Sequence, residues 1–276
     1  MEIRVWGSRG SFICPEEGFS RYGGNTTCLQ ITDAQGRTLL LDAGSGLIRF
    51  GRHVLEQGVP ESPVFHLLLS HTHIDHLQGF SFFTPIHFPN TRVKIYCAGH
   101  EVNRVEDTFK RMFHKSYSPI QKIENLQANI EFIELEESHS YNVNGFMVSP
   151  LFLEHPSPTF GFRVHSGEKS FGLITDHEVR DPHLNARVVD FFQGCDLVFH
   201  DGQYTPEEYD SAVGWGHSSI DAAIQNGKDT GTPRLGIFHH SPDHDDEDLG
   251  ELEARYTAAN PDMDLFWVRE DMSISL

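Results

Sequence analysis

Short apolar runs bounded by turn residues dominate the pattern along the chain, and such runs are typical of buried β-strands. The runs that predict strands are residues 1–6, 26–32, 37–42, 64–69, 93–97, 130–135, 146–153, 161–165, 170–175, 195–199, 234–238 and 265–268. A turn at residues 33–36 joins the second and third of these, and another at 166–168 joins two strands of the second half. The chain is therefore expected to be rich in strands throughout.

Apolar residues at helical spacing interrupt this pattern. They recur from Leu47 to Leu55 after Gly46, and the Gly and Pro of residues 58–60 end the helix. The same criteria predict helices over 100–113, near 219–228 and over 246–257, and a loop over 115–127. Many strands with interspersed helices favour the α/β class, here a four-layer αββα sandwich. At this length we expect a single domain covering residues 1–276.

Composition and charge limit the class of partner. Hydrophobic residues make up 38% of the 276 residues, which is typical of a folded globular protein. The 21 basic and 40 acidic residues give a formal net charge of −19. Because binding to a phosphate backbone depends on many Lys and Arg side chains, this charge disfavours an extended nucleic-acid or anionic-membrane surface. A small phosphorylated substrate is still compatible, since a bound metal can reverse the field locally.

The sequence also bears on the compartment. No apolar run approaches the roughly 18 residues that would span a bilayer, and the first residues lack the pattern of a signal peptide. The cysteines Cys14, Cys28, Cys97 and Cys195 form no Cys-x-x-Cys pair, which favours reduced structural thiols. We expect a soluble, cytoplasmic protein with no membrane partner, and leave its oligomeric state open, with a homodimer as one alternative.

The strongest chemical signal is the segment SHTHIDH at residues 70–76. It directly follows an apolar run and contains three His and one Asp, namely His71, His73, Asp75 and His76. Imidazole and carboxylate groups are ligands that zinc and similar divalent ions prefer. In an extended segment, two His separated by one residue face the same way, and the adjacent Asp and His can turn toward a second ion. A solvated loop rarely contains such a cluster by chance, so the segment predicts a metal site.

Further candidate ligands also come directly after apolar runs. His155 and Asp176 each follow a predicted strand, and His239 and His240 both follow the run 234–238. Strand ends that converge on one edge of a sandwich would bring these side chains to the first cluster. Neighbours in an extended chain point to opposite faces, so only one of His239 and His240 is expected to face the metals.

Residues 71–76 resemble the HxHxDH signature of the metallo-β-lactamase fold superfamily, and the resemblance covers nearly the whole chain. It implies an αββα sandwich and two divalent metal ions, with zinc expected and manganese as the alternative. The implied ligands are His71, His73 and His155 for the first ion, Asp75, His76 and His239 for the second, and Asp176 as the bridge. The family's register favours His239 over His240, and Asp42 would brace the metal loop without binding metal.

Two more segments resemble the ribonuclease Z-like branch of this superfamily. Residues 199–204, FHDGQY, resemble its His-acid element, and residues 216–219, GHSS, resemble its Gly-His-Ser motif. The resemblance implies that Asp201 orients His217, and that His217 contacts the scissile phosphate. A simpler alternative is that Ser218 or Ser219 caps the next helix. We find no Gly- and Lys/Arg-rich arm like the one with which ribonuclease Z grips tRNA, so the chain looks closer to the branch's small phosphodiesterases.

These features predict a dinuclear metal-dependent phosphodiesterase that acts on a small cyclic nucleotide or on a similar diester. Asp75 would accept the proton of the attacking water, and His217, oriented by Asp201, would stabilise or protonate the leaving group. The alternatives are a hydrolase of a thioester, lactone or sulfate ester with the same fold, and a metal-binding sensor or scaffold.

Two weaker signals flank the predicted site. Residues 7–11 with Arg9 resemble an anion-binding loop, although a plain Gly-rich turn is favoured. The phenylalanines near the metal loop are expected in the core rather than as a base-stacking platform. They are Phe80, Phe82, Phe83 and Phe88.

Overall fold

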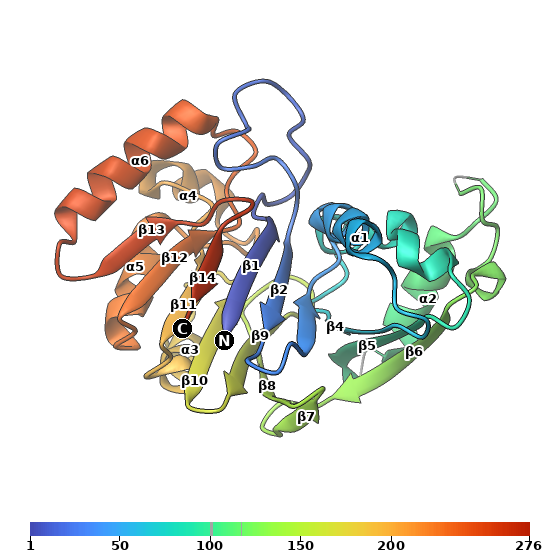
Figure 1. Ribbon diagram of the computed structural model, residues 1–276. Coiled ribbons are helices and arrows are strands. Elements are labelled where there is room, and N and C mark those ends of the chain that lie inside the picture. The colour runs from blue at the N-terminus through green and yellow to red at the C-terminus, as the bar shows by residue number, and fades with distance from the viewer. Residues whose placement is uncertain (100–101, 117) are drawn as a thin grey trace.

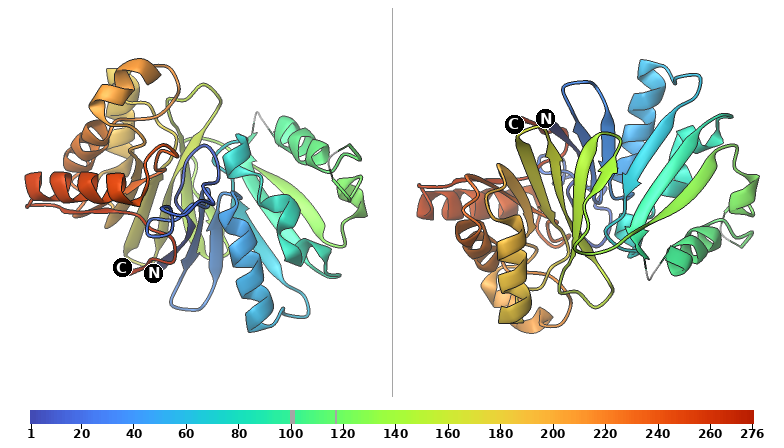
Figure 2. Two further views of the ribbon diagram at one scale, coloured as in Figure 1. Left: turned by 90° about the horizontal axis from the view of Figure 1, so that it is seen from above. Right: turned by 90° about the horizontal axis from the view of Figure 1, so that it is seen from below.

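The structure, a computed structural model, describes all residues except 100, 101 and 117. The described residues form two seven-stranded sheets that pack face to face, with helices on both outer faces (Figure 1). Seen along the layers, the order is helix, sheet, sheet, helix (Figure 2). The αββα sandwich predicted from the pattern of strands and helices is thereby confirmed.

The first sheet has the strand order β14-β1-β2-β3-β4-β5-β6. Its strands are β1 (Glu2–Gly7), β2 (Cys28–Thr32), β3 (Thr38–Leu41), β4 (Val64–Leu68), β5 (Arg92–Ala98), β6 (Asn129–Leu135) and β14 (Ser273–Ser275). The pairs from β3 to β6 are parallel, whereas β14, β1, β2 and β3 pair antiparallel. Helices α1 (Gly46–Gln57) and α2 (Val102–Met112) cover the outer face of this sheet (Figure 2).

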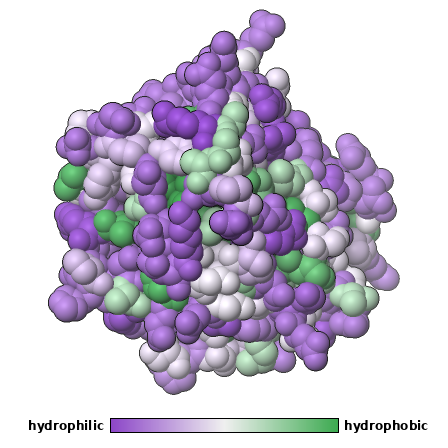
Figure 3. All heavy atoms as spheres, turned by 90° about the vertical axis from the view of Figure 1, so that its left-hand side faces the viewer, coloured by the Kyte–Doolittle hydropathy of each residue, from purple (hydrophilic) through white to green (hydrophobic). Residues whose placement is uncertain are grey.

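The second sheet has the strand order β13-β12-β11-β10-β9-β8-β7. Its strands are β7 (Tyr141–Val143), β8 (Phe146–Phe152), β9 (Phe160–Ser166), β10 (Lys169–Ile174), β11 (Leu197–Asp201), β12 (Arg234–Phe238) and β13 (Asp264–Trp267). The pairs from β10 to β13 are parallel. Its helices are α3 (Pro182–Phe192), α4 (Pro206–Ala212), α5 (Ile220–Asp229) and α6 (Asp246–Ala259). The face that carries α6 is mainly hydrophilic, with scattered apolar patches (Figure 3).

Three apolar clusters hold the layers together. The central cluster lies between the sheets and includes Ile31, Phe162, Phe171 and Phe199, all fully buried. The other two fill the spaces between each sheet and its helices. Full burial of each such side chain stabilises the fold by about 1.5–3 kcal/mol. The parallel strands β11 and β12 are buried at nearly every position, which explains why residues 195–199 and 234–238 read as apolar runs.

Several elements were not predicted from the sequence. They are α3, α4, β7, β14 and short 3₁₀ turns such as Ile123–Asn125. The starts of both helices were legible, since Asp181 and Thr205 act as N-caps with Pro at the next position. Strand β14 has three residues and buries only Ile274, so it has no pattern to detect. Of the helix predicted over 100–113, residues 100 and 101 lie outside the described residues and 102–112 are helical.

The parallel strands determine where polar side chains can gather. The carboxyl ends of β3 and β4 in one sheet, and of β10, β11 and β12 in the other, lead into the segments that carry the candidate ligands. This is the edge at which α/β sheets usually bind ligands. Among the described residues, none of the helices combines the length and apolar character that crossing a membrane requires.

Candidate metal centre

The segment after β4 brings four polar side chains to this edge. The backbone leaves the sheet after Leu68, has no regular structure up to His73, which is extended, and closes in a 3₁₀ turn over Ile74–His76. As expected for alternate residues of an extended segment, the rings of His71 and His73 lie together, with centroids 4.5 Å apart. The 3₁₀ turn then directs Asp75 and His76 to the neighbouring position.

One group of candidate ligands consists of His71, His73, His155 and Asp176. Their nearest nitrogen and carboxylate oxygen atoms all lie within 4.8 Å of one another. His73 Nδ1 is 3.2 Å from His155 Nε2, and His71 Nε2 is 3.4 Å from Asp176 Oδ2. The two His of the β4 loop therefore meet side chains from the second sheet.

A second group consists of Asp75, His76, Asp176 and His239, all buried. Asp176 Oδ1 lies 3.2 Å from His76 Nε2 and 3.3 Å from His239 Nε2. Asp75 Oδ2 lies 3.3 Å and 3.2 Å from the same two nitrogens. Asp176 thus presents Oδ2 to the first group and Oδ1 to the second, the arrangement of a bridging carboxylate. Each group draws side chains from both sheets.

The donor atoms of these two groups fit divalent cations. His71 Nε2 and His76 Nε2 are buried and make no hydrogen bond, although carboxylate oxygens lie 3.2–3.4 Å from them. A buried polar atom left unsatisfied costs about 1–3 kcal/mol, and a cation at each position would satisfy these atoms. Imidazole nitrogens with carboxylate oxygens form the donor set that zinc and similar ions prefer.

Hydrogen bonds from the outer nitrogens of three candidate ligand histidines fix the direction of their inner nitrogens. His76 Nδ1 donates to Asp42 Oδ2 at 2.9 Å, and His155 Nδ1 donates to the carbonyl oxygen of Gly216 at 3.0 Å. His239 Nδ1 lies 2.9 Å from Gln203 Oε1. Since these oxygens accept hydrogen bonds, the proton is on Nδ1 and the lone pair of Nε2 faces the centre.

Strained backbone marks the same edge. Asp42, Asp176 and His239 have φ values of 60°, 35° and 60°, in the left-handed region that non-Gly residues rarely adopt. Each such residue costs of order 1–3 kcal/mol, and such strain clusters at functional sites. The position of His239 brings its Nε2 to the cluster, whereas His240 Nε2 donates to the carbonyl oxygen of Val268 at 2.6 Å.

The electrostatics of the cluster favour bound cations. Burial lowers the pKa of His71 well below its ordinary value and that of His155 to about 4, so both imidazoles are neutral and able to bind a cation at pH 7. At His76 burial also acts to lower the pKa, but the carboxylates of Asp176 and Asp75 outweigh it and raise the pKa. The buried carboxylates therefore stabilise positive charge at this position.

His217 lies beside the second group. Its Nδ1 is 2.9 Å from Asp201 Oδ2, and its ring stacks on that of His239 with centroids 4.9 Å apart. Burial opposes the charged form, but the Asp201 carboxylate prevails and raises the pKa of His217 to about 9. Ser219 also caps α5, since its hydroxyl accepts from the Ala222 amide. The Gly-His-Ser segment therefore both starts the helix and presents the imidazole.

The position of Gly216 requires a glycine, because there is no room for a side chain. Its φ is +91°, and a Cβ there would lie 2.1 Å from His155 Nδ1. Any other residue would therefore displace the imidazole that Gly216 holds through its carbonyl oxygen.

Sequence reasoning missed three residues that support the cluster. Gln203 accepts from His239 and donates to Ser11 Oγ at 3.3 Å, while the Ser11 amide donates to Asp75 Oδ2 at 2.9 Å. Glu178 accepts from the amides of Gly214 at 2.7 Å and Gly216 at 3.1 Å. Gln203 was part of a quoted motif without a role, and Glu178 had no signal beyond its closeness to Asp176.

The suggestion that Arg9 meets a phosphate is wrong. Arg9 is fully buried, and its guanidinium donates to the carbonyl oxygens of Gly23, Ser241 and His244 at 2.8–3.0 Å. Arg9 therefore ties the segment around residues 7–11 to the segment after β12. The favoured alternative, a structural turn, agrees with these contacts.

Comparison with known protein families identifies the family to which this chain belongs. A family model described as "Beta-lactamase superfamily domain" matches residues 37–240, which include the seven side chains of both groups. The chain belongs to the beta-lactamase superfamily. The metallo-β-lactamase resemblance stated from residues 71–76 is thereby confirmed.

Relatives place this superfamily member near the ribonuclease Z-like branch. Ribonuclease Z of Staphylococcus carnosus is 27% identical over 180 residues, which are 61% of this chain and 54% of that protein. The chain spans about half the length, or less, of the curated relatives it matches.

Solved structures share the fold of this superfamily member over its full length. A diphosphatase of the PhnP family has a TM-score of 0.71 at 17% identity, with coverage of 100% of this chain and 97% of that one. Unliganded yeast PDE1 has a TM-score of 0.70 at 12% identity, with coverage of 100% and 99%. Identities this low show a common fold alone.

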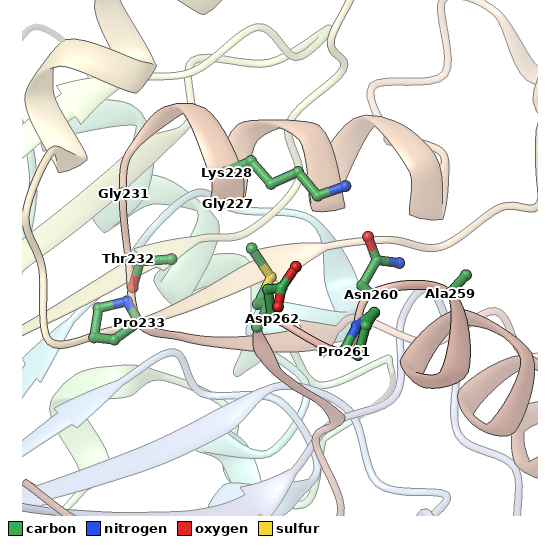
Figure 4. Close-up of a pocket in the computed structure, with 10 residues that line it drawn as sticks. Gly227, Lys228, Gly231, Thr232, Pro233, Ala259, Asn260, Pro261 and Asp262 are labelled. Carbon is green, nitrogen blue, oxygen red and sulfur yellow. The ribbon is translucent and has the colours of Figure 1, made fainter.

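A cavity of about 440 Å³ lies away from this chemistry. It opens between the ends of α5 and α6, where Lys228, Asn260 and Asp262 line it (Figure 4). None of its described lining residues belongs to the cluster, so it has no part in the candidate metal centre.

Proposed function

We propose that the protein is a dinuclear metal-dependent phosphodiesterase acting on a small cyclic nucleotide or on a similar phosphodiester. The observation that carries the proposal is Asp176, whose two oxygens face two separate groups of imidazoles. The His217–Asp201 pair at 2.9 Å stands beside the second group, where it can serve a leaving group.

The proposed cofactors are two divalent ions, zinc or, alternatively, manganese. The first would be held by His71, His73, His155 and Asp176, and the second by Asp75, His76, Asp176 and His239. Such ions, when bound, supply positive charge that activates water and stabilises negative charge on phosphate oxygens.

The residues of the chain supply binding, orientation and proton transfer. Asp75 would accept the proton of the attacking water, because its Oδ2 is held at the cluster by the Ser11 amide. His217, protonated and oriented by Asp201, would donate a proton toward the departing oxygen. The names of the relatives, ribonuclease Z and a diphosphatase, denote cleavage of phosphate linkages and support this choice over other hydrolases of the fold.

The proposal treats residues 1–276 as one domain, because each cation position draws ligands from both sheets. The proposal also predicts a small substrate and a cytoplasmic location.

The test is hydrolysis by metal-reconstituted protein. Wild type and His71→Ala would be assayed on bis-p-nitrophenyl phosphate, cyclic and linear nucleotide diesters, a thioester and a lactone. We expect the wild type to bind two metal ions per chain and to cleave diesters. The His71→Ala variant should keep the fold, bind less metal and cleave no diester. Preferential cleavage of the thioester or lactone, or full activity of His71→Ala, would overturn the proposal. One tightly held ion and no turnover would favour a sensor or scaffold.

A further inference from the structure

Exposed apolar side chains stand next to the candidate metal centre. Ile74 lies between two candidate ligands, His73 and Asp75, and its side chain is 64% exposed. Phe82 is also 64% exposed, whereas its neighbours Phe80 and Phe83 are buried. The expectation of core positions therefore holds for Phe80 and Phe83 and is wrong for Phe82 and for Phe88, which is 36% exposed. Large exposed apolar groups beside a candidate site indicate a binding surface.

Ile74 and Phe82 form one wall of a cavity of about 500 Å³, here called the Ile74–Phe82 pocket. Met112, Pro119 and Ile120 line it from the side of α2 and the loop that follows. Among its described lining residues, none is Asp, Glu, Lys or Arg. His87 is the one titratable side chain among these described lining residues, so in a chain with a net charge of −19 the pocket suits an uncharged part of a ligand. Its volume lies within the range of small-molecule sites.

The walls of this pocket are held in place from behind. Phe80 packs edge-on against Phe109 of α2 with ring centroids 4.7 Å apart, which ties the turn carrying Phe82 to the helix carrying Met112. Gln78, which also lines the pocket, donates from its side-chain amide to Thr26 Oγ1 at 3.0 Å. The pocket is therefore formed before a ligand arrives, and little free energy is lost in ordering it.

The side chains that line the pocket favour a heteroaromatic ring over an acyl chain. Phe82 offers an exposed ring for stacking, and the Met112 thioether suits contact with an aromatic face. Ser81, Thr84 and Ser118 add hydroxyl groups to the same lining. A heteroaromatic ring can use both the stacking surface and the hydroxyls, whereas an acyl chain can use only the first.

We propose that the Ile74–Phe82 pocket binds a planar heteroaromatic group of the substrate, such as a nucleobase, while the phosphate lies at the metal centre. This inference rests on the proposed function and adds a specificity determinant to it. Because stacking on an aromatic side chain contributes to the binding of a base, removing the Phe82 ring should weaken binding about tenfold.

Binding tests the pocket independently of turnover. Adenosine 5′-monophosphate and methyl phosphate would be titrated calorimetrically into metal-loaded wild type, Phe82→Ser and Phe88→Ser. Phe88 is the matched control because it is 36% exposed in the same region and does not line the pocket. We expect Phe82→Ser alone to bind the nucleotide about tenfold more weakly, with methyl phosphate unchanged. Met112→Ser provides a second variant with the same expected loss.

Turnover then separates this inference from the proposed function. Thymidine 5′-(p-nitrophenyl phosphate), hexyl p-nitrophenyl phosphate and methyl p-nitrophenyl phosphate share one leaving group. Preference for the thymidine ester, lost in Phe82→Ser and kept in Phe88→Ser, supports the pocket. A preference for the hexyl ester, or equal losses in both variants, overturns it while leaving diester hydrolysis intact. Selective nucleotide binding without cleavage of any diester would instead overturn the proposed function and support the pocket.

Discussion

At the scale of single residues, one step of register separates His239 from His240. His239 Nε2 faces Asp75 and Asp176, whereas His240 Nε2 donates to the carbonyl oxygen of Val268. We therefore expect His239→Ala to lose one of two metal ions per chain and nearly all activity. His240→Ala should keep both ions and lose about 1–3 kcal/mol of stability from a buried hydrogen bond and packing. Elemental analysis and thermal unfolding measure both; loss of metal only in His240→Ala contradicts the register.

The pair of His217 and Asp201 predicts a change in pH dependence. A proton donor is effective at pH values below its pKa, so its contribution to the rate falls as the pH rises through that pKa. The Asp201 carboxylate raises the pKa of His217 to about 9. Asp201→Asn removes the charge that supports the imidazolium, so the alkaline limb of the rate profile should move to lower pH. His217→Ala should lower kcat about 10²–10⁴-fold. Both variants should keep two metal ions; loss of an ion would make His217 a ligand instead.

At the scale of elements, the segment before α5 depends on one buried carboxylate. Glu178 holds the amides of Gly214 and Gly216, and Gly216 in turn holds His155. We expect Glu178→Ala to displace this segment, to weaken metal binding about 10–100-fold as is usual for such supporting contacts, and to lower activity. Tyr209→Phe is the matched control, because it removes only the hydroxyl that donates to Glu178 at 3.0 Å. Equal effects of both variants would contradict this role.

Elements with a strong local signal were the ones predicted from the sequence. The run 64–69 predicted β4 because it is apolar at every position except His66, and the dense cluster of residues 71–76 lies directly after it. Gln203 and Glu178 were missed because each acts through partners distant in sequence: His239 for one, Gly214 and Gly216 for the other. Only the packed fold brings these together. The prediction of core positions was wrong for Phe82 and Phe88 because the hydrophobicity of a phenylalanine is equally compatible with a core and an exposed position.

At the scale of the whole molecule, the net charge of −19 argues against polyanionic substrates. We expect precursor tRNA to bind weakly and to be processed slowly at physiological salt, because few phosphates can be neutralised. Filter binding over a salt series, alongside cleavage of a small diester, measures this. Tight binding that weakens steeply with salt would contradict the prediction and place the chain with the tRNA-processing members of its branch.

Each proposed cation position is lined by side chains from both sheets, so the rate of limited proteolysis should depend on bound metal. Residues 136–140 join β6 of one sheet to β7 of the other, and Glu136 there is exposed. Cations that bind only the assembled sandwich stabilise it by mass action, so chelation should let the sheets separate more often. A Glu-specific protease should then cut after Glu136 or Glu137 faster in chelated than in metal-loaded protein, leaving two fragments visible on a gel. Equal rates would show that the sandwich stays closed without its cations, and metal scarcity would then leave the lifetime of the protein unchanged.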